Sequence, residues 1–161
     1  MTGLYGRSHW QQEAEAALLR HNSSGAQACL LMLDIDYFKQ INDQLGHTVG
    51  DEVIRAMAHI VSGCVRATDC AGRYGGDEFA IILNDMNADA ALQVAQRILE
   101  QVEAKRFRGL PDLRFTSSIG IAAADRSHTR LRDWMDAADV ALYQAKNAGR
   151  NRVVGETAQL A

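Results

Sequence analysis

The stretch Arg73–Tyr74–Gly75–Gly76–Asp77–Glu78–Phe79–Ala80–Ile81–Ile82–Leu83 decides the fold class of this chain of 161 residues. Residues 79–83 form an apolar run of strand length, and the two glycines before it are typical of a tight turn between neighbouring strands. Strands joined by so short a turn pair in an antiparallel way, which excludes a purely parallel, doubly wound sheet. The stretch therefore predicts an α+β fold with a mainly antiparallel central sheet flanked by helices.

The rest of the chain predicts the element order α-β-α-α-β-β-α-β-α-β. Residues 29–33 are apolar throughout, as in a strand buried on both faces, whereas residues 113–121 alternate and predict a strand with one buried face. Apolar residues at spacings of three and four predict the helices. The expected helices cover about 8–20, 37–44, a longer range after Gly50, about 91–102, and 131–145, the last ending before Gly149. A polar loop at 22–25 is expected to close the first helix, and Asp36 to cap the second. Residues 152–154 are expected to form a last strand.

Composition describes an ordinary globular domain, with 47% apolar and 23% charged residues. The net charge of −3 argues against a nucleic-acid partner, which would need a broad basic surface. We find no signal peptide and no apolar stretch near the ~20 residues of a membrane span, so we expect a cytoplasmic domain without membrane contact from this segment. Cys29, Cys64 and Cys70 lack a metal-site spacing and are expected to be reduced thiols, with Cys29 and Cys64 at core positions.

Two pairs of carboxylates lie beside apolar strands. Asp34 and Asp36 follow residues 29–33, and Asp77 and Glu78 precede residues 79–83. A solvated hairpin tip would explain the second pair, and capping would explain Asp36. A carboxylate as deep as Asp34 needs a partner or a cation. Oxygens from Asp34, the Ile35 carbonyl and Asp77 would suit Mg²⁺, provided that the two strand ends are neighbours.

Two cations, Lys146 and Arg150, flank residues 147–149 near the end of the last helix. The helix dipole alone favours cations there. Beside a metal-binding pair of acids, they also become candidates for binding phosphate groups.

Several segments resemble the GGDEF family of diguanylate cyclases, in the right order and spacing over essentially the whole chain. They are residues 34–43, Gly46–His47, Gly50–Asp51, 73–79, Thr116–Gly120, Ala137–Lys146, Gly149–Asn151 and the opening Thr2–Leu4. Gly6 replaces the asparagine that is common after that opening. The resemblance implies a nucleotidyl cyclase or polymerase-palm (ferredoxin-like) architecture and a single GGDEF domain over residues 1–161. It also implies a larger parent protein, which could carry a membrane anchor, with an upstream sensory or dimerisation module.

The resemblance also implies a reaction. Two GTP molecules in two facing copies attack each other's α-phosphate through their 3′-hydroxyls, which yields cyclic di-GMP and two pyrophosphates and requires a homodimer. The implied catalytic residues are Asp77 and Glu78, and the implied ligands of Mg²⁺, or of Mn²⁺, are Asp34, Ile35, Asp77 and Glu78. Substrate binding is implied for Phe38, Lys39, Asn42, His47, Asp51, Gly75, Gly76, Lys146 and Arg150, with Asn42 and Asp51 at the guanine. For His47 a structural hydrogen bond is an equal alternative.

A last motif is Arg66–Ala67–Thr68–Asp69. A helix-end ion pair is sufficient to explain it. Arg66 precedes Gly75 by nine residues, as in the family's product-inhibition site. The resemblance therefore implies that Arg66, Asp69 and Arg97 bind cyclic di-GMP.

Two functions other than catalysis remain as hypotheses. A module that senses GTP or cyclic di-GMP without turnover would typically lack the hairpin carboxylates, which are present here. A structural dimerisation domain leaves the acidic and guanine-site residues unexplained. The sequence therefore favours the cyclase.

Overall fold

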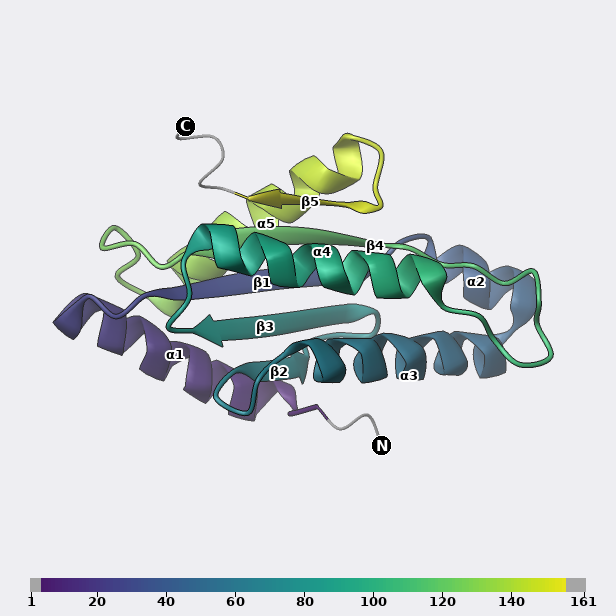
Figure 1. The fold of residues 1–161 in the computed structure, drawn as a ribbon, viewed down its shortest axis with the longest axis horizontal. Coiled ribbons are helices and arrows are strands. Elements are labelled where there is room, and N and C mark those ends of the chain that lie inside the picture. The colour runs from purple at the N-terminus through teal and green to yellow at the C-terminus, as the bar shows by residue number, and fades with distance from the viewer. Residues whose placement is uncertain (1–3, 156–161) are drawn as a thin grey trace.

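Five strands form one sheet in the order β2-β3-β1-β4-β5 (Figure 1). A computed structural model of the chain describes residues 4–155. The strands are β1 Ala28–Ile35, β2 Cys70–Arg73, β3 Glu78–Asn84, β4 Ser117–Ala123 and β5 Arg152–Gly155. The pairs β1/β3, β1/β4 and β2/β3 are antiparallel, and β4/β5 is parallel. The predicted α+β fold and element order are confirmed; the opening residues Thr2 and Gly3 lie outside the described range.

Helices cover both faces of the sheet. They are α1 Arg7–Ser24, α2 Phe38–Leu45, α3 His47–Cys64, α4 Ala88–Ala104 and α5 Leu131–Asn147. Helices α3 and α4 lie on one face, α1 and α5 on the other, and α2 lies at one end of the sheet (Figure 1). The polar loop predicted at 22–25 is wrong, because α1 continues through Ser24 and ends at Gly25, whose φ of 80° is a left-handed cap that glycine adopts without strain.

Strand β1 alternates between two cores. Its odd-numbered residues from Cys29 to Ile35 pack in the core under α3 and α4, and Leu30 and Met32 pack in the core under α1 and α5. Because side chains alternate along a strand, Asp34 lies on the same face as Leu30 and Met32. That is the face covered by α5.

The strand predicted over residues 113–121 is only partly confirmed. Strand β4 begins at Ser117 and is buried on both faces, because it lies between β1 and β5 and packs against α4 and α5. Leu113 and Phe115 are buried in the loop before it, where the rings of Phe115 and Phe107 are 5.9 Å apart. The alternating pattern of residues 113–121 therefore arises from two buried loop residues followed by a strand in the middle of the sheet.

Helix α5 approaches β4 so closely that only glycine fits at position 120. A Cβ atom on Gly120 would stand 2.2 Å from the Leu142 nitrogen and 2.3 Å from the Ala138 carbonyl oxygen. This contact fixes the height of α5 above the sheet, and with it the position of Lys146 near the helix end.

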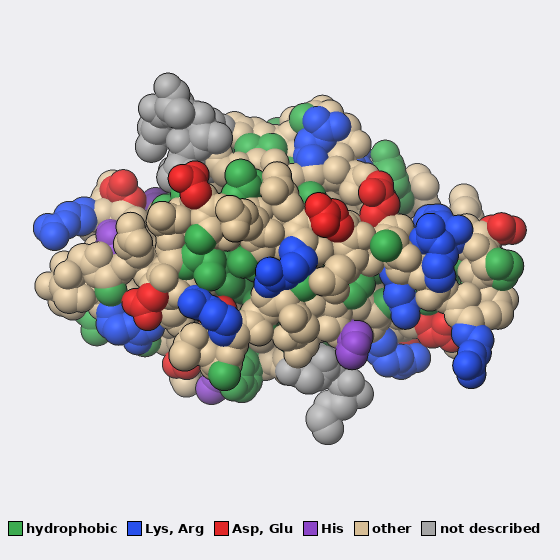
Figure 2. Space-filling model, viewed as in Figure 1, with side chains coloured by type: hydrophobic (Ala, Val, Ile, Leu, Met, Phe, Trp, Pro, Cys, Tyr) green, Lys and Arg blue, Asp and Glu red, His purple; other side chains and the backbone are tan. Residues whose placement is uncertain are grey.

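Charges of both signs are interspersed over the face seen in Figure 2, with the densest group of basic side chains at the end where α2 lies. Of the helices within residues 4–155, none has both the length and the apolar character that a membrane crossing requires.

Candidate active site

The end of β1 and the hairpin between β2 and β3 are neighbours, as the predicted metal site requires. The β1/β3 register places Asp34 directly opposite Glu78. One step further, the Ile35 N–H donates to the carbonyl oxygen of Asp77 at 3.2 Å. Residues directly opposite each other in an antiparallel pair share a face, so the carboxylates of Asp34 and Glu78 lie on the α5 side of the sheet.

Asp34 is buried, and one of its oxygens is unsatisfied. Lys146 on α5 forms an ion pair with Oδ2, whereas Oδ1 is buried and has no hydrogen-bond partner among the described residues. Burial raises the pKa of Asp34 above its usual value, the Lys146 ammonium lowers it in part, and the charges of Asp77 and Asp36 add to the increase. Asp34 Oδ1 therefore has neither a donor nor a cation among the described residues.

Glu78 lies folded against the hairpin tip. A Cβ atom on Gly75 would be 2.7 Å from Glu78 Oε1, so a side chain at position 75 would displace this carboxylate. Burial raises the pKa of Glu78, and the charges of Asp34, Asp77 and Asp139 raise it further. Arg73 stabilises the tip from outside, since its Nη2 donates to the Gly76 carbonyl at 2.7 Å and its Nε donates to the Gly75 carbonyl at 3.2 Å.

A pocket of about 320 Å³ joins Asp34 and Asp77 to the two predicted cations, whereas Glu78 is not among its lining residues. Its walls come from the end of β1, the start of α2, the hairpin and the end of α5 with the turn that follows. The lining residues are Asp34, Ile35, Asp36, Tyr37, Phe38, Lys39, Gln40, Asp77, Lys146 and Arg150. Asp34 and Lys146, which are 112 residues apart in the sequence, thus meet in one pocket with Asp77 and Arg150.

Asp36 does not cap α2, so that prediction is wrong. The N-cap is Tyr37, which makes no side-chain capping bond. The Asp36 carboxylate instead accepts from the hydroxyls of Thr116 and Ser118, each at 2.7 Å, and from the Asn151 N–H at 3.0 Å. Thr116 precedes β4, Ser118 lies in β4, and Asn151 lies in the turn after α5. The Asp36 carboxylate therefore points away from α2 and connects these two segments.

The residues predicted to bind guanine lie where α2 meets α3. Asn42 Oδ1 is 1.8 Å from the position that a Cβ atom on Gly50 would take, so glycine allows the Asn42 side chain to lie beside the start of α3. Asp51, the next residue, and His47 are exposed on that helix. None of the three lines the acidic pocket, but the Phe38 ring lies against the same Gly50 position at 3.4 Å and connects the two regions.

The described residues offer few side-chain ligands to a metal ion. Within residues 4–155, His, Cys, Asp and Glu side chains do not form a group of three arranged to hold a metal ion. The unsatisfied Asp34 Oδ1 and the raised pKa of Asp34 and Glu78 nevertheless fit a divalent cation that takes its remaining ligands from substrate phosphates.

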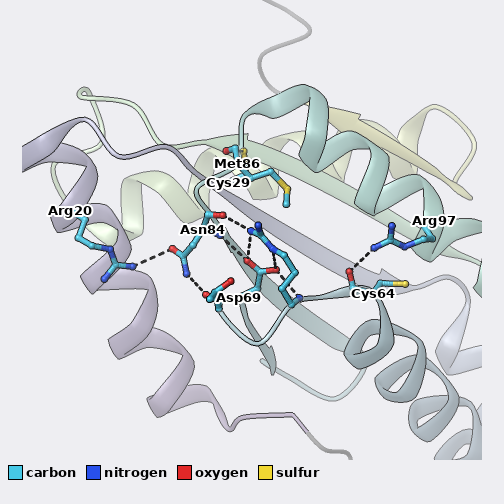
Figure 3. Close-up of polar contacts among 9 residues, drawn as sticks. Arg20, Cys29, Cys64, Asp69, Asn84, Met86 and Arg97 are labelled. Carbon is cyan, nitrogen blue, oxygen red and sulfur yellow. Dashed lines mark hydrogen bonds and ion pairs between the residues drawn. The ribbon is translucent and has the colours of Figure 1, made fainter.

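Arg66 and Asp69 form the ion pair that the sequence allowed. Arg66 Nη2 and Nε donate to the two oxygens of Asp69 at 2.9 and 3.0 Å. Figure 3 shows Asp69 beside Asn84 at the end of β3, with Arg97 of α4 pointing to Cys64, whose carbonyl it reaches at 2.9 Å. The Arg66 side chain is 50% exposed, so the ion pair leaves part of the guanidinium open to solvent.

Two contacts were not predicted from the sequence. Tyr37 places its ring under the Arg150 guanidinium at 4.7 Å. Asn84 uses all four of its polar groups. Its backbone N–H donates to the Asp69 carboxylate and its side-chain amide nitrogen donates to the Thr68 carbonyl. Its backbone carbonyl accepts from Arg66, and its side-chain oxygen accepts from Arg20. Neither residue is an acid or a base, and the partners are distant in sequence, so no local pattern indicates these roles.

The three cysteines are buried and free, and the predicted core positions of Cys29 and Cys64 are confirmed. Burial raises the pKa of Cys29 to about 12 and, together with the charge of Glu13, that of Cys70 to about 11.

Comparison with known proteins agrees with this geometry. The probable diguanylate cyclase DgcC of Escherichia coli (strain K12) is 40% identical over 152 residues, which are 94% of this chain and 41% of DgcC. The response regulator PleD of Caulobacter vibrioides is 38% identical over 98% of this chain and 36% of its own length. The chain thus spans about two fifths of the length of these curated relatives.

Solved structures agree as well. The GGDEF domain of DgcB from Caulobacter crescentus, in complex with c-di-GMP, has a TM-score of 0.90 and 33% identity, covering 96% of this chain and 90% of that one. The active GGEEF domain of a diguanylate cyclase from Vibrio cholerae has a TM-score of 0.89 and 29% identity, covering 95% of this chain and 97% of that one. The sequence matches the family described as "Diguanylate cyclase, GGDEF domain" over residues 1–152, and the chain belongs to this family.

Proposed function

We propose that this chain condenses two GTP molecules into cyclic di-GMP and two pyrophosphates across two facing copies. The single observation that carries the proposal is the pocket in which Asp34 and Asp77 lie together with Lys146 and Arg150. Phosphoryl transfer needs positioning and charge stabilisation more than covalent chemistry, and such a mixed pocket provides both.

The triphosphate is assigned to Lys146, Arg150 and the start of α2. Lys146 offers a compact ammonium, and Arg150 offers a planar guanidinium suited to two phosphate oxygens. The first backbone N–H groups of α2, at Phe38 and Lys39, lack partners inside the helix and favour anions. Phosphate contacts would thus come from two sides of the pocket.

Mg²⁺, or Mn²⁺, would be held by the Asp34 and Asp77 carboxylates and the Ile35 carbonyl, with Glu78 beside them. When bound, such an ion neutralises charge on the phosphate oxygens. Lys146, which forms the one ion pair of Asp34 within residues 4–155, would then be available to a phosphate, because the ion would share the charge of Asp34.

Asp77 is the group assigned to accept the 3′-hydroxyl proton. It stands at the hairpin tip, where Gly75 and Gly76 allow close approach of a nucleotide. Glu78 lies next to it, and its raised pKa suits a carboxyl group that shares the proton.

Guanine recognition is assigned to Asn42 and Asp51. A carboxylate accepts from the N1–H and N2–H₂ edge of guanine, and an amide side chain can bind O6 or N3. The Asn42 contact with Gly50 places both side chains at the α2–α3 junction, one helical turn beyond Phe38. His47 is a candidate nucleotide contact at the first position of α3.

The test is an assay of a dimerised fusion of the chain with GTP and Mg²⁺, with cyclic di-GMP measured by chromatography and mass spectrometry. We expect product. Bound GTP without product would contradict the proposal and favour the sensing module.

We further propose that cyclic di-GMP inhibits the chain at Arg66, Asp69 and Arg97. The half-exposed Arg66 lies just after the end of α3, and Arg97 donates to the carbonyl of Cys64, the last residue of that helix, so two guanidinium planes could stack on guanine bases there. Calorimetry should show binding at micromolar cyclic di-GMP and a marked loss in Arg66→Ala. Wild-type chain that binds no cyclic di-GMP would refute this regulation without affecting the proposed catalysis.

A further inference from the structure

Tyr37 and Arg150 both have backbones in the left-handed region. The φ of Tyr37 is 55°, and those of Arg150 and the following Asn151 are 65° and 49°. A bulky residue is rare in this region, and such outliers cluster at functional sites. Three of the four described non-glycine residues with positive φ therefore lie at or beside one pocket.

One carboxylate joins the two left-handed segments. Asp36, directly before Tyr37, accepts from the N–H of Asn151, directly after Arg150, at 3.0 Å. The Asp36 N–H also donates to the Thr116 carbonyl at 2.9 Å. The two segments are fixed against each other, and the Arg150 guanidinium carbon lies 4.7 Å from the centre of the Tyr37 ring.

The stack leaves the guanidinium donors available. No side chain or carbonyl within residues 4–155 forms a hydrogen bond or an ion pair with the Arg150 guanidinium. This differs from Arg66, whose donors are occupied by Asp69 and Asn84. A guanidinium held by the face of an aromatic ring keeps its in-plane N–H groups free for an anion.

We infer that Tyr37 is a positioning residue, which holds the Arg150 guanidinium in place for the β- and γ-phosphates of GTP. This inference rests on the proposed function. Tyr37 acts through Arg150, so its effect should depend on those phosphates and on the aromatic face, and its hydroxyl should matter little.

The experiment measures binding of 3′-deoxy-GTP, which lacks the attacking hydroxyl, by calorimetry in the presence of Mg²⁺. Tyr37→Leu keeps apolar bulk but removes the aromatic face, and we expect its Kd to rise about 2- to 5-fold. Tyr37→Phe should restore wild-type affinity. Tyr143→Leu is the matched control, because Tyr143 is an exposed tyrosine on α5 that does not line the pocket.

Two further measurements separate positioning from general structural damage. GMP, which lacks the β- and γ-phosphates, should bind wild-type and Tyr37→Leu chains equally in competition assays. In an Arg150→Ala background, Tyr37→Leu should have no additional effect.

Unchanged affinity of Tyr37→Leu, an equal loss for GMP, or additive losses with Arg150→Ala would each overturn the inference. Wild-type chain that fails to bind 3′-deoxy-GTP would instead contradict the proposed function itself, and the inference with it.

Discussion

Asp34 and Asp36 are two positions apart, yet their chemical environments differ completely. Asp36 receives three hydrogen bonds and is a satisfied structural acid. Asp34 has one ion pair and a buried oxygen without a partner among the described residues. The difference arises because Asp36 lies beyond the sheet next to free donors, whereas Asp34 lies inside it beside another acid. Of the two, Asp34 is the one with capacity left to bind a ligand.

Asp36→Ala should destabilise the fold, because it leaves three donors unsatisfied at the junction of β1, β4 and α5. We expect the free energy of unfolding to fall by about 2–4 kcal/mol, measured by urea denaturation. Asp36→Asn, which retains one acceptor oxygen and can donate to a hydroxyl, should lose less. Equal stability of Asp36→Ala and wild type would contradict the structural role of Asp36.

Asp77→Ala should abolish product while the fold stays intact. Loss of a proton acceptor and metal ligand is expected to reduce the rate of cyclic di-GMP formation by at least about 100-fold. Rate assays together with circular dichroism check both statements. Asp89→Ala is the control and should retain turnover, because Asp89 is an exposed acid on α4 that does not line the pocket. Unaltered turnover of Asp77→Ala would refute its assignment.

At the scale of elements, the sequence predicted correctly those helices and strands whose limits depend on nearby residues. The glycine-led hairpin and the buried β1 were predicted correctly, because turn chemistry and apolar runs are local. The start of β4 was predicted wrongly, because its limits depend on pairing with β1 and β5. The strand end and the hairpin tip each looked like a possible site, but their adjacency follows from the β1/β3 register, which only the folded sheet shows.

The contact between α5 and β4 predicts the effect of a single methyl group. Gly120→Ala places Cβ against backbone atoms of Leu142 and Ala138, which cannot rotate away, so α5 must move. We expect a loss of about 1–3 kcal/mol or more in the free energy of unfolding, and weaker GTP binding because Lys146 moves with the helix.

Gly63→Ala is the matched control for that substitution. Gly63 lies within α3, and apart from its chain neighbours and the backbone of its own helix no described atom lies within 4 Å of the position that its Cβ would take, so alanine fits there. Alanine should raise the free energy of unfolding by up to ~1 kcal/mol, since glycine is a poor helix former. If Gly120→Ala and Gly63→Ala had the same free energy of unfolding, the close approach of α5 to β4 would not be what requires glycine at position 120.

At the scale of the molecule, the pocket holds one set of the groups to which we assign phosphate binding. Its walls come from residues 34–40, from Asp77 and from Lys146 and Arg150. One such set would bind one triphosphate, whereas the proposed ring closure consumes two. The proposed reaction therefore requires a second copy of the chain that faces the first one.

Catalysis should consequently depend on protein concentration. For the isolated chain at low concentration, specific activity should rise in proportion to concentration, because the fraction of facing pairs does so. Two copies joined by a flexible Gly/Ser linker have an effective concentration on the order of mM, so dilution should not lower their specific activity. A linked pair with Asp77→Ala in one copy is the control: it should form almost no cyclic di-GMP, because each ring needs two intact half-sites. Dilution-independent activity of an isolated chain that is monomeric by gel filtration at the same concentrations, or half the activity in that control, would show that one copy suffices.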